Sequence, residues 1–386
     1  MNAVLTLLGL SSRFVGGSET YARELSQQLG EHGWQSIICF LDEPPEHVRQ
    51  YLALPNVSIE VLPNAVTPNS HAFREFARLL RRYKPDIIHM QLVGFVHFYP
   101  WLAKLLSAKK IFFTDQGSHA SDYVARRAKL WKRLAVRIIN QPMSKVICVS
   151  RYNYDNFKTR DILPVSRYEV IYNSADFSRV KESKERRKKF RARYGIAEGQ
   201  CVILQVSMII PEKGITDLLE AVRLVREQNA NAHLVLAGEG SYRDQFTALG
   251  EKLGLAGHVT WTGVVSDPFA EGAYDAADIV CQVSRWQEAF GQTIAEAMAC
   301  RKPVIGTRVG GIPELINDGD AGYVVEAGDP QAIAEKINLL LDDAGLRAQM
   351  GETGYAVAQN RFNLEKNVRR VLELYGITNG IVPENR

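Results

Sequence analysis

Short apolar runs alternate with longer amphipathic runs along almost the whole chain, and this alternation constrains the fold more than any other feature. The apolar runs are nearly continuous, as in "AVLTLL" at residues 3–8 and "HLVLAG" at 233–238, which is typical of parallel strands covered on both faces. Strands that alternate with helical runs indicate βαβ units. Because the runs form two series, we predict an α/β fold with two doubly wound parallel-sheet domains.

The two series place the domain boundary near residues 173–181. The strands expected in the first series are "AVLTLL", "QSIICFL", "VSIEVL", "DIIHM", "KIFFT", "KVICVS" and "YEVIY". Those expected in the second are "CVILQVS", "HLVLAG", "VTWTG", "DIVCQVS", "PVIGT" and "GYVV". We therefore expect a first domain over 1–175, a second over 176–361, and a final helix within 362–386. This helix can pack back on either domain, including the N-terminal one.

Between the two series lies the charged stretch "KESKERRKKFRARYG", which is interrupted by Glu182 and Glu185. A solvated helix that opens the second domain explains this pattern better than a nucleic-acid-binding patch does. The net charge of +4 over 386 residues gives no case for nucleic acid as a partner either.

Composition narrows the class of protein further. The start, "MNAVLTLLGLSSRF", lacks the basic region of a secretory signal, and no apolar run approaches the length of a membrane span. The five cysteines are scattered, without a CxxC or metal-ligand spacing, so we expect buried reduced thiols and no metal. These features favour a cytoplasmic protein.

Candidate binding residues follow the strands, where ligands bind in open α/β sheets. Lys213 stands just where a helix begins, and a cation beside helix amides suits a diphosphate, although an ordinary loop lysine fits equally well. Gly238 in "LAGEGSYRDQF" lets the backbone turn tightly near a ligand, as glycines in such connections often do. Gly310-Gly311, followed by Pro313, marks another ligand-facing turn. No complete GxGxxG opens a βαβ unit, which argues against a nicotinamide enzyme.

The segment "RWQEAFGQTIAE" carries the most specific pattern, with Glu288 and Glu296 eight positions apart. On one regular helix they would differ by roughly 80° in azimuth and about 12 Å in rise, which is too wide for a shared proton. The Phe290-Gly291 step instead predicts that Glu288 lies in a loop and that a helix begins near Gln292.

This arrangement would create an anion site at the start of the helix. The free amides of Gly291, Gln292 and Thr293 would face a phosphate there. Glu296, one turn inside, would reach past the phosphate to a vicinal diol. Glu288 would accept hydrogen bonds from another polyol on the loop side.

The order of these motifs resembles retaining glycosyltransferase family 4, also described as glycosyl transferases group 1. Glu-x7-Glu with Phe-Gly inside is followed by "EAMA", "PVI", "GGIPE" and "DGDAGYVV". Before it come "FVGGSETYARELSQQL", "ICVSRYN", "VIYNSADF", "PEKG" and "GEG", in the expected order. The resemblance covers nearly the whole chain and implies the GT-B fold, in which two Rossmann-like domains face each other across a cleft.

The resemblance also implies a role for each matching residue. Glu288 would hold hydroxyls of the donor sugar, and Glu296 would hold the ribose diol of the nucleotide. Lys213 would neutralise the leaving diphosphate, so that neither a metal nor another cofactor is needed. The backbone amides that would bind sugar and phosphate are those of Phe290, Gly291 and Gln292.

Three further positions complete the donor site that the resemblance implies. Gly17 would bring the first helix against the donor when the cleft closes, and the base would lie near Gly238 and Val264. Similar enzymes retain the configuration of the sugar, and a phosphate oxygen helps to deprotonate the acceptor. Catalysis then rests on positioning and on charge stabilisation.

The chain departs from the family pattern at two cationic positions. Ser207-Met208 stands where the family usually has Gly-Arg, so the usual arginine partner of Lys213 is missing. Losing one of two diphosphate cations would cost a few kcal/mol of charge-assisted bonding, unless another basic residue substitutes. Arg301 stands where a glycine usually follows "EAMAC", and it is either a solvated surface residue or a phosphate ligand.

Family members often place a histidine after the strand that corresponds to "FFTDQGSH". Here Gln116 occupies that place and His119 lies three residues later, so either side chain can take over the contact with the donor sugar. A solvent-facing loop histidine is the alternative. For His89 and His97 a packed structural role is favoured, and Asn173 in "YNSADF" is expected at the hinge.

The segment "SDYVARRAKLWKRLAVRIINQP" at residues 121–142 predicts a basic amphipathic helix. Its apolar residues are Val124, Leu130, Trp131, Leu134 and Ile138, set against six arginines and lysines. The helix can pack on the first domain's sheet with its basic side outward. Alternatively, it can contact an anionic membrane, which a lipid-linked acceptor would favour.

We therefore expect a retaining, metal-independent glycosyltransferase that moves a sugar from a nucleotide-sugar donor, with UDP- and GDP-sugars favoured. The acceptor would be a glycan, a lipid-linked glycan or a small molecule, in polysaccharide or glycoconjugate synthesis. A non-catalytic nucleotide-sugar-binding protein is the alternative.

Overall fold

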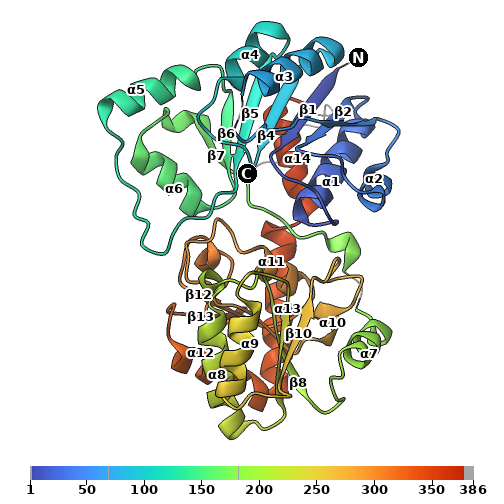
Figure 1. The fold of residues 1–386 in the computed structure, drawn as a ribbon, viewed down its shortest axis with the longest axis vertical. Helices are drawn as coiled ribbons and strands as arrows, with labels where there is room; N and C mark the ends of the chain where they lie inside the picture. The colour runs from blue at the N-terminus through green and yellow to red at the C-terminus, as the bar shows by residue number, and fades with distance from the viewer. Residues whose placement is uncertain (1, 68, 181, 378–386) are drawn as a thin grey trace. The chain divides into compact units, whose positions relative to one another are not determined.

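The computed structural model describes residues 2–67, 69–180 and 182–377, and the chain forms two units (Figure 1). The first unit contains the chain up to Gly117, Val124–Tyr172 and the segment from Leu364. The second contains Ser118–Tyr123 and Asn173–Asn363. The expected boundary at residues 175/176 lies within a few residues of this border. The short segment 118–123, expected in the first domain, instead belongs to the second unit.

The first unit is built on a seven-stranded parallel sheet in the order β3-β2-β1-β4-β5-β6-β7. Its strands are β1 (Ala3–Leu8), β2 (Gln35–Phe40), β3 (Val57–Val61), β4 (Ile87–Gln91), β5 (Lys110–Asp115), β6 (Lys145–Cys148) and β7 (Tyr168–Val170). Its helices are α1 (Gly17–Glu31), α2 (Glu46–Leu52), α3 (Ser70–Tyr83), α4 (Tyr99–Leu106), α5 (Leu130–Ile139), α6 (Arg151–Arg160) and α14 (Leu364–Tyr375). All seven expected strands are present.

The second unit is built on a six-stranded parallel sheet in the order β10-β9-β8-β11-β12-β13. Its strands are β8 (Cys201–Val206), β9 (Ala232–Ala237), β10 (Val259–Gly263), β11 (Ile279–Gln282), β12 (Val304–Thr307) and β13 (Gly322–Val325). Its helices are α7 (Lys184–Arg193), α8 (Ile215–Gln228), α9 (Arg243–Lys252), α10 (Ala273–Ala276), α11 (Gln292–Ala299), α12 (Pro330–Asp342) and α13 (Ala344–Arg361). All six expected strands are confirmed.

Four short 3₁₀ turns complete the described elements, η1 (Val165–Arg167), η2 (Phe177–Arg179), η3 (Pro211–Lys213) and η4 (Ile312–Glu314). Some helices start where a polar side chain accepts from a free amide: Asn69 accepts from the Ala72 amide at 2.9 Å, and Asp329 accepts from the Ala332 amide at 2.9 Å. Helices cover both faces of each sheet (Figure 1). Because the strands of each sheet are parallel, the loops that follow them emerge at the same edge of that sheet, where a ligand site can form.

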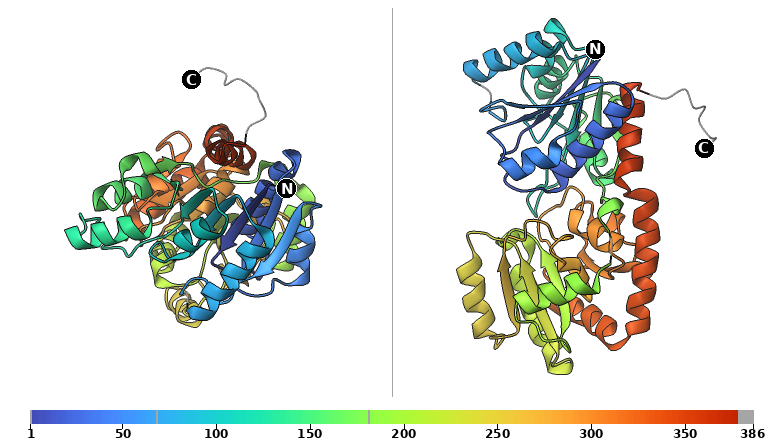
Figure 2. Two further views of the ribbon diagram at one scale, coloured as in Figure 1. Left: turned by 90° about the horizontal axis from the view of Figure 1, so that it is seen from above. Right: turned by 90° about the vertical axis from the view of Figure 1, so that its right-hand side faces the viewer.

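The final helix belongs to the first unit. Leu364, Val368 and Leu372 of α14 join an apolar cluster that includes Leu25 and Leu29 of α1. Figure 2 shows α14, in red, beside the blue α1. A hydrogen bond 2.5 Å long joins the Tyr375 hydroxyl to Nδ1 of the buried His89.

The charged stretch after residue 180 forms α7, as expected, but the helix is only partly solvated. Arg186 and Arg187 pair with Asp275 and Asp278, at 2.7 Å and 3.2 Å, and Arg191 is buried. These pairs bind α7 to its own unit rather than leaving a basic surface for nucleic acid.

Residues 121–142 correct one expectation. Only Leu130–Ile139 are helical, and no residue of this helix is buried. The five apolar residues of the predicted stripe, Val124, Leu130, Trp131, Leu134 and Ile138, are exposed and therefore do not pack on the sheet. Across residues 2–67, 69–180 and 182–377, no helix has both the length and the apolar character that crossing a bilayer requires.

Candidate functional site

The loop after β11 and the first turn of α11 form the core of the candidate site in the second unit. Gly291 caps α11 with φ 122°, a backbone conformation that favours glycine. The amides of Ile294 and Ala295 donate to the Gly291 carbonyl at 3.0 Å and 3.2 Å. The predicted helix start at Gln292 is thus confirmed, and Glu288 lies in the loop before it.

The Glu288 carboxylate is buried and held by several donors. Its Oε1 accepts from Lys213 Nζ at 2.6 Å and from Ser284 Oγ at 2.5 Å. Its Oε2 accepts from Ser118 Oγ at 3.4 Å. Burial alone would raise the pKa of Glu288, but the Lys213 ammonium and the hydrogen bonds outweigh burial and lower it. Glu288 is therefore a charged hydrogen-bond acceptor in a site that is almost closed to water.

Lys213 reaches Glu288 because the loops after β8 and β11 pack closely. A side chain on Gly214 would place its Cβ 1.8 Å from the Val283 carbonyl oxygen, so only glycine allows this approach. The Arg285 amide donates to the Glu212 carbonyl at 2.8 Å, which ties the two loops together. The Lys213 ammonium also lies 4.4 Å from the centre of the Trp286 ring.

The glycine pair after β12, Gly310-Gly311, packs against the backbone of Gln287 and Glu288. The Gly311 amide donates to the Glu288 carbonyl at 2.8 Å, and the Gly310 amide donates to the Gln287 side chain at 2.8 Å. A Cβ on Gly310, at φ 54°, would lie 2.0 Å from the Glu288 carbonyl oxygen. The turn expected to face a ligand therefore shapes the backbone of Glu288.

Glu296 lies one turn inside α11, as expected, and two protein donors already hold it. Tyr274 donates its hydroxyl to Oε2 at 2.6 Å, and Gln292 Nε2 donates to Oε1 at 3.0 Å. Burial raises the pKa of Glu296, although these hydrogen bonds oppose the shift. A carboxylate has about four lone-pair sites, so a diol can still bind to the two that remain.

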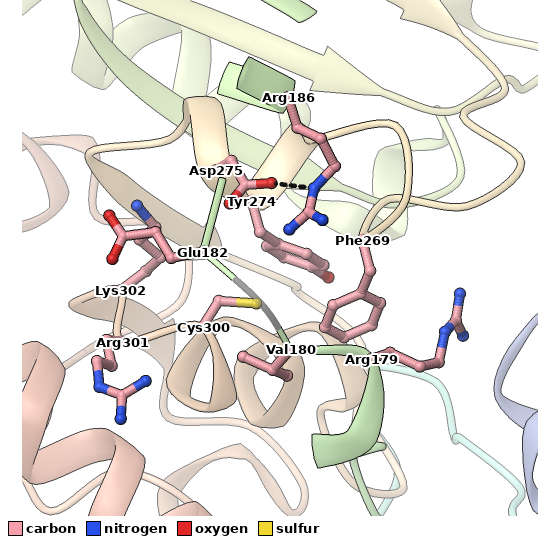
Figure 3. Close-up of a pocket in the computed structure, with 10 residues that line it drawn as sticks. All are labelled: Arg179, Val180, Glu182, Arg186, Phe269, Tyr274, Asp275, Cys300, Arg301 and Lys302. Atoms are coloured by element: carbon pink, nitrogen blue, oxygen red, sulfur yellow. Dashed lines mark hydrogen bonds and ion pairs between the residues drawn. The ribbon is translucent and has the colours of Figure 1, made fainter. Parts of the chain in front are cut away.

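Tyr274 also lines a small cavity in the second unit (Figure 3). Arg186 donates to Asp275 at its rim, at 2.7 Å, and this pair fixes the residue next to Tyr274. The remaining lining residues are Arg179, Val180, Glu182, Phe269, Cys300, Arg301 and Lys302. The cavity therefore borders the residue that orients Glu296.

The amides of Gly291, Gln292 and Thr293 precede the first amides that donate within α11, so they are available to an anion. Thr293 Oγ1 donates to the Val206 carbonyl at 3.0 Å, which holds the helix start against the end of β8. Lys213 has three N–H donors and gives one to Glu288. The site can thus bind a phosphate, and two carboxylates beside it can accept from hydroxyl groups.

Gly238 and Val264 lie side by side at the ends of β9 and β10. The Gly238 amide donates to the Gly263 carbonyl at 2.9 Å, and Val264 is exposed. A Cβ on Gly238 would lie 1.9 Å from the Ser207 carbonyl oxygen. The close approach of the loop after β8 therefore requires a glycine at position 238, independently of any contact with a ligand.

The residues after β5 separate into two groups. Gln116 remains in the first unit, where its Nε2 donates to Gln91 Oε1 at 3.0 Å. His119 belongs to the second unit, where its backbone exchanges hydrogen bonds with Gln287 at 2.9 Å and 2.8 Å. The two bonds explain why residues 118–123 belong to this unit. They also pair the His119 backbone with Gln287, the residue before Glu288 in the sequence. The His119 ring stacks on the Tyr123 ring, with the two ring centres 3.9 Å apart.

Gly17 is the first residue of α1 and is exposed. Glu19 fixes this start, since its carboxylate accepts from the Gly16 amide at 3.0 Å and from Ser12 Oγ at 2.6 Å. The helix N-terminus expected near Gly17 is present in the first unit. Asn173, expected at the hinge, is the first residue of the second unit after the border.

The two departures at cationic positions differ in their surroundings. Met208 is half exposed, so the missing arginine is not replaced by a packed side chain. Arg301 pairs with Glu352 at 2.9 Å, and its guanidinium lies 3.7 Å from the centre of the Tyr355 ring. Arg301 therefore packs on α13, as a surface residue would.

The structure also decides between packing and exposure for two histidines. His89 is fully buried, with Nε2 2.6 Å from Thr114 Oγ1. His97 is buried beside Tyr99, whose ring centre lies 4.7 Å away. Both have the packed role that the sequence favoured.

Three residues of the site were missed by sequence reasoning. Ser284 stands four residues before Glu288, a spacing that could have suggested a contact across the loop. Ser118 and Tyr274 gave no signal, because their contacts cross 170 and 22 residues of chain.

Comparison with known proteins identifies both halves of the chain. Residues 186–357 match the family model described as "Glycosyl transferases group 1". Residues 15–179 match the model described as "Glycosyltransferase Family 4". The two matches fall on the second and the first sheet, respectively.

Among curated proteins, the chain is 28% identical over 373 residues to N-acetyl-alpha-D-glucosaminyl L-malate synthase of Bacillus anthracis, and the match covers 94% of each chain. It is 29% identical over 248 residues to a GDP-mannose-dependent alpha-(1-6)-phosphatidylinositol monomannoside mannosyltransferase of Mycolicibacterium smegmatis, which covers 63% of this chain and 64% of that protein.

Among solved structures, a glycosyltransferase from Rickettsia africae has a TM-score of 0.80 at 23% identity, covering 97% of this chain and 98% of its own. Anabaena HepE in complex with UDP and glucose has a TM-score of 0.77 at 20% identity, covering 96% and 99%. These similarities confirm the GT-B fold.

Proposed function

Because this chain is a glycosyltransferase of the family 4 type with the GT-B fold, we propose that it transfers a sugar with retention of configuration and without a metal ion. The donor is a nucleotide-sugar, with UDP- and GDP-sugars favoured. The second unit binds the donor, and the first unit binds the acceptor.

The observation that carries this proposal is the buried Lys213–Glu288 pair beside the start of α11. The diphosphate binds to the amides of Gly291 and Gln292 and to the Lys213 ammonium, which stabilises the charge of the leaving group. Glu288 accepts from hydroxyls of the sugar, and Glu296 accepts from the ribose.

The state of Glu288 argues against a covalent glycosyl-enzyme intermediate. A covalent route needs a carboxylate that is free to attack the sugar, whereas Oε1 of Glu288 already accepts from two donors. We infer that a phosphate oxygen of the donor deprotonates the acceptor, while Gln116 or His119 contacts the sugar. Catalysis then comes from positioning and electrostatic stabilisation.

The names of the relatives support two donor classes and leave the acceptor class open. HepE was solved with UDP-glucose, and the mycobacterial relative is named as GDP-mannose-dependent. One relative is named for L-malate and another for a phosphatidylinositol mannoside, so a small molecule, a glycan and a lipid-linked glycan all remain as acceptors. All five cysteines are free thiols, which supports work in the cytoplasm, at a membrane face when the acceptor is lipid-linked.

A thermal-shift screen with UDP, GDP, ADP, CMP, dTDP and NAD tests the donor class. A nucleotide at a hundred times its dissociation constant should add about 2.7 kcal/mol to the free energy of unfolding. One nucleoside diphosphate should shift the melting temperature and NAD should not. Glu296→Ala should weaken that nucleotide while the fold survives, and unchanged affinity would remove Glu296 from the ribose site.

Turnover of the matching nucleotide-sugar, measured with a chelator present, tests the reaction. We expect donor hydrolysis or transfer to continue in the chelator, and its loss would refute metal independence. The exposed Met208 favours the alternative of a non-catalytic nucleotide-sugar-binding protein. A nucleotide shift without any donor turnover would establish that alternative.

A further inference from the structure

An apolar face of α5 is left exposed by the described residues of the first unit. Leu130, Trp131, Leu134 and Ile138 are 65%, 64%, 50% and 66% exposed, and Val124, just before the helix, is 68% exposed. At 100° per residue, the four helical side chains fall within an arc of roughly 100°. They therefore form one continuous face rather than scattered exposed residues.

The orientation of α5 is fixed by contacts on its other sides. Val136 packs against the main apolar cluster of the unit. Arg133 and Arg137 hydrogen-bond to the carbonyl of Asp161 at the end of α6, and both also pair with its carboxylate. These contacts hold the apolar face away from the core.

The neighbouring helix α4 extends this face. Trp101 of α4 donates its indole N–H to the Ile138 carbonyl at 2.9 Å, so the two helices are in contact. Leu105, one turn along α4 from Trp101, is 77% exposed, and Phe98, at the start of the helix, is 59% exposed. We call Phe98, Leu105, Val124, Leu130, Trp131, Leu134 and Ile138 the α4–α5 surface. Soluble proteins rarely leave an apolar area of this extent uncovered.

Basic residues accompany the α4–α5 surface. Arg126, Lys129 and Lys132 are exposed next to it, as is Lys104 of α4. The sequence from 124 to 142 contains six arginines and lysines and no acidic residue. Asp161, which packs against this segment, is already shared by Arg127, Arg133 and Arg137, so it leaves the other cations uncompensated.

We propose that the α4–α5 surface docks on an anionic lipid bilayer. The apolar side chains enter the interface between headgroups and acyl chains, and the exposed lysines and arginines bind the headgroups. Trp131 suits this boundary because its ring is apolar and its N–H is polar, and Lys132 lies 5.4 Å from the centre of that ring. A second copy of the chain fits less well, since two equally basic surfaces would repel each other.

Sedimentation with vesicles tests this docking on the full-length chain, and it does not use donor turnover. We expect binding to phosphatidylcholine vesicles that contain phosphatidylserine, with much weaker binding to phosphatidylcholine alone and at high salt. The double variant Trp131→Ser/Leu134→Ser should lower the partition coefficient at least about tenfold. Lys129→Gln/Lys132→Gln should lower it about tenfold or more at low salt, and little at high salt.

Two variants on the second unit serve as matched controls. Leu339→Ser removes an exposed leucine from α12, and Lys188→Gln/Lys252→Gln removes two exposed lysines, so neither should alter vesicle binding. Circular dichroism confirms that each variant folds. Absence of binding at low salt, or equal binding by the Trp131→Ser/Leu134→Ser variant, would overturn the proposal. A concentration-dependent dimer that this variant abolishes would assign the surface to a second copy instead.

Discussion

At the scale of single residues, the Lys213–Glu288 pair gives the clearest prediction about activity. Glu288→Gln keeps the shape of the side chain and removes its negative charge, which faces the Lys213 ammonium. We expect turnover to fall about a hundredfold or more, with nucleotide affinity changed less than about tenfold, because the amide is a poorer acceptor where charge develops. Steady-state kinetics and nucleotide titration provide both values.

Glu212→Gln is the matched control, since Glu212 neighbours Lys213 but is exposed. Turnover equal to that of the unchanged protein in both variants would remove Glu288 from the sugar site.

Gly310 carries a second prediction, about stability. Its Cβ would lie 2.0 Å from the Glu288 carbonyl oxygen, and its φ is 54°. Gly319 has φ 87° and nothing within 4 Å of its Cβ position, so Gly319→Ala measures the backbone penalty alone. We expect Gly310→Ala to cost at least about 2 kcal/mol more than Gly319→Ala in urea unfolding. Equal costs would show that the Gly310 turn can move away from Glu288.

These residues also show how far sequence reasoning reaches at a site. Glu288 and Glu296 were separable because the Phe290-Gly291 step marks a helix start, which is a local property of the chain. The partners of both carboxylates were not predicted. Lys213, Ser118 and Tyr274 come from three other parts of the chain, the turn η3, the segment after β5 and helix α10, and their approach depends on tertiary packing. The constraint imposed by Gly310 likewise appears only once a second loop lies against it.

At the scale of elements, the C-terminal end of α11 explains why a glycine would be favoured at position 301. Arg301 has φ 56°, and the amides of Arg301 and Lys302 donate to the carbonyls of Met298 and Ala297, both at 3.0 Å. This is the left-handed helix ending that glycine usually provides. The arginine therefore occupies a strained position, and its contacts with Glu352 and Tyr355 offset the cost.

Comparison of two substitutions isolates that strain. Arg301→Ala and Arg301→Gly both remove the contacts on α13, but only glycine relieves the backbone. We expect the glycine variant to be more stable than the alanine variant by about 1 kcal/mol in urea unfolding. Equal stability would mean that the end of α11 relaxes out of the left-handed conformation.

The helices and strands were predicted well where the hydrophobic pattern of the sequence was strong. The prediction was poor where the question was which face of a helix is buried. Most β strands are largely apolar, and α14 shows an apolar stripe, so their sequences identify them. Residues 121–142 have an equally clear stripe, yet only Leu130–Ile139 are helical and their apolar face is exposed. A hydrophobic pattern indicates that a face exists, and it does not indicate what covers that face.

At the scale of the whole molecule, the two sheets followed from the sequence, but the path of the chain between the units did not. Residues 118–123 join the second unit through two backbone hydrogen bonds to Gln287. Backbone pairing of this kind cannot be predicted from the pattern of side chains in the sequence. The return of α14 to the first unit rests instead on buried apolar side chains and on Tyr375. The sequence predicted this helix and left open which of the two domains it packs on.

Buried histidines in both units predict that the whole molecule loses stability in mild acid. Burial lowers the pKa of His89 from 6.5 to about 3, and those of His97 and His233 from 6.5 to about 4. Below about pH 6.5 the unfolded chain binds protons at these positions and the folded chain does not. Their stabilising contribution is therefore complete above pH 6.5 and declines as the pH falls toward the folded pKa values.

The stability lost through the histidines in acid exceeds the stability recovered at buried carboxyl groups. At about pH 5 each of the three histidines should cost about 2 kcal/mol of stability relative to neutral pH. Burial raises the pKa of Asp115 from 3.8 to about 6, so the folded chain gains a proton there and recovers about 1 kcal/mol. Glu296, whose pKa burial also raises, acts in the same direction in the second unit. The histidines outnumber these carboxyl groups, and the net change is a loss.

Urea unfolding at about pH 7.5 and about pH 5 measures this loss, and a histidine substitution assigns it. His89→Gln should destabilise the first unit at both pH values, because it disturbs the bonds to Thr114 and Tyr375, but the difference between the two should shrink by about 2 kcal/mol. His71→Gln, at an exposed position of α3, should leave the difference unchanged. If His89→Gln keeps the full pH dependence, the folded protein must admit a proton at His89, and the acid sensitivity would then come from groups outside its buried core.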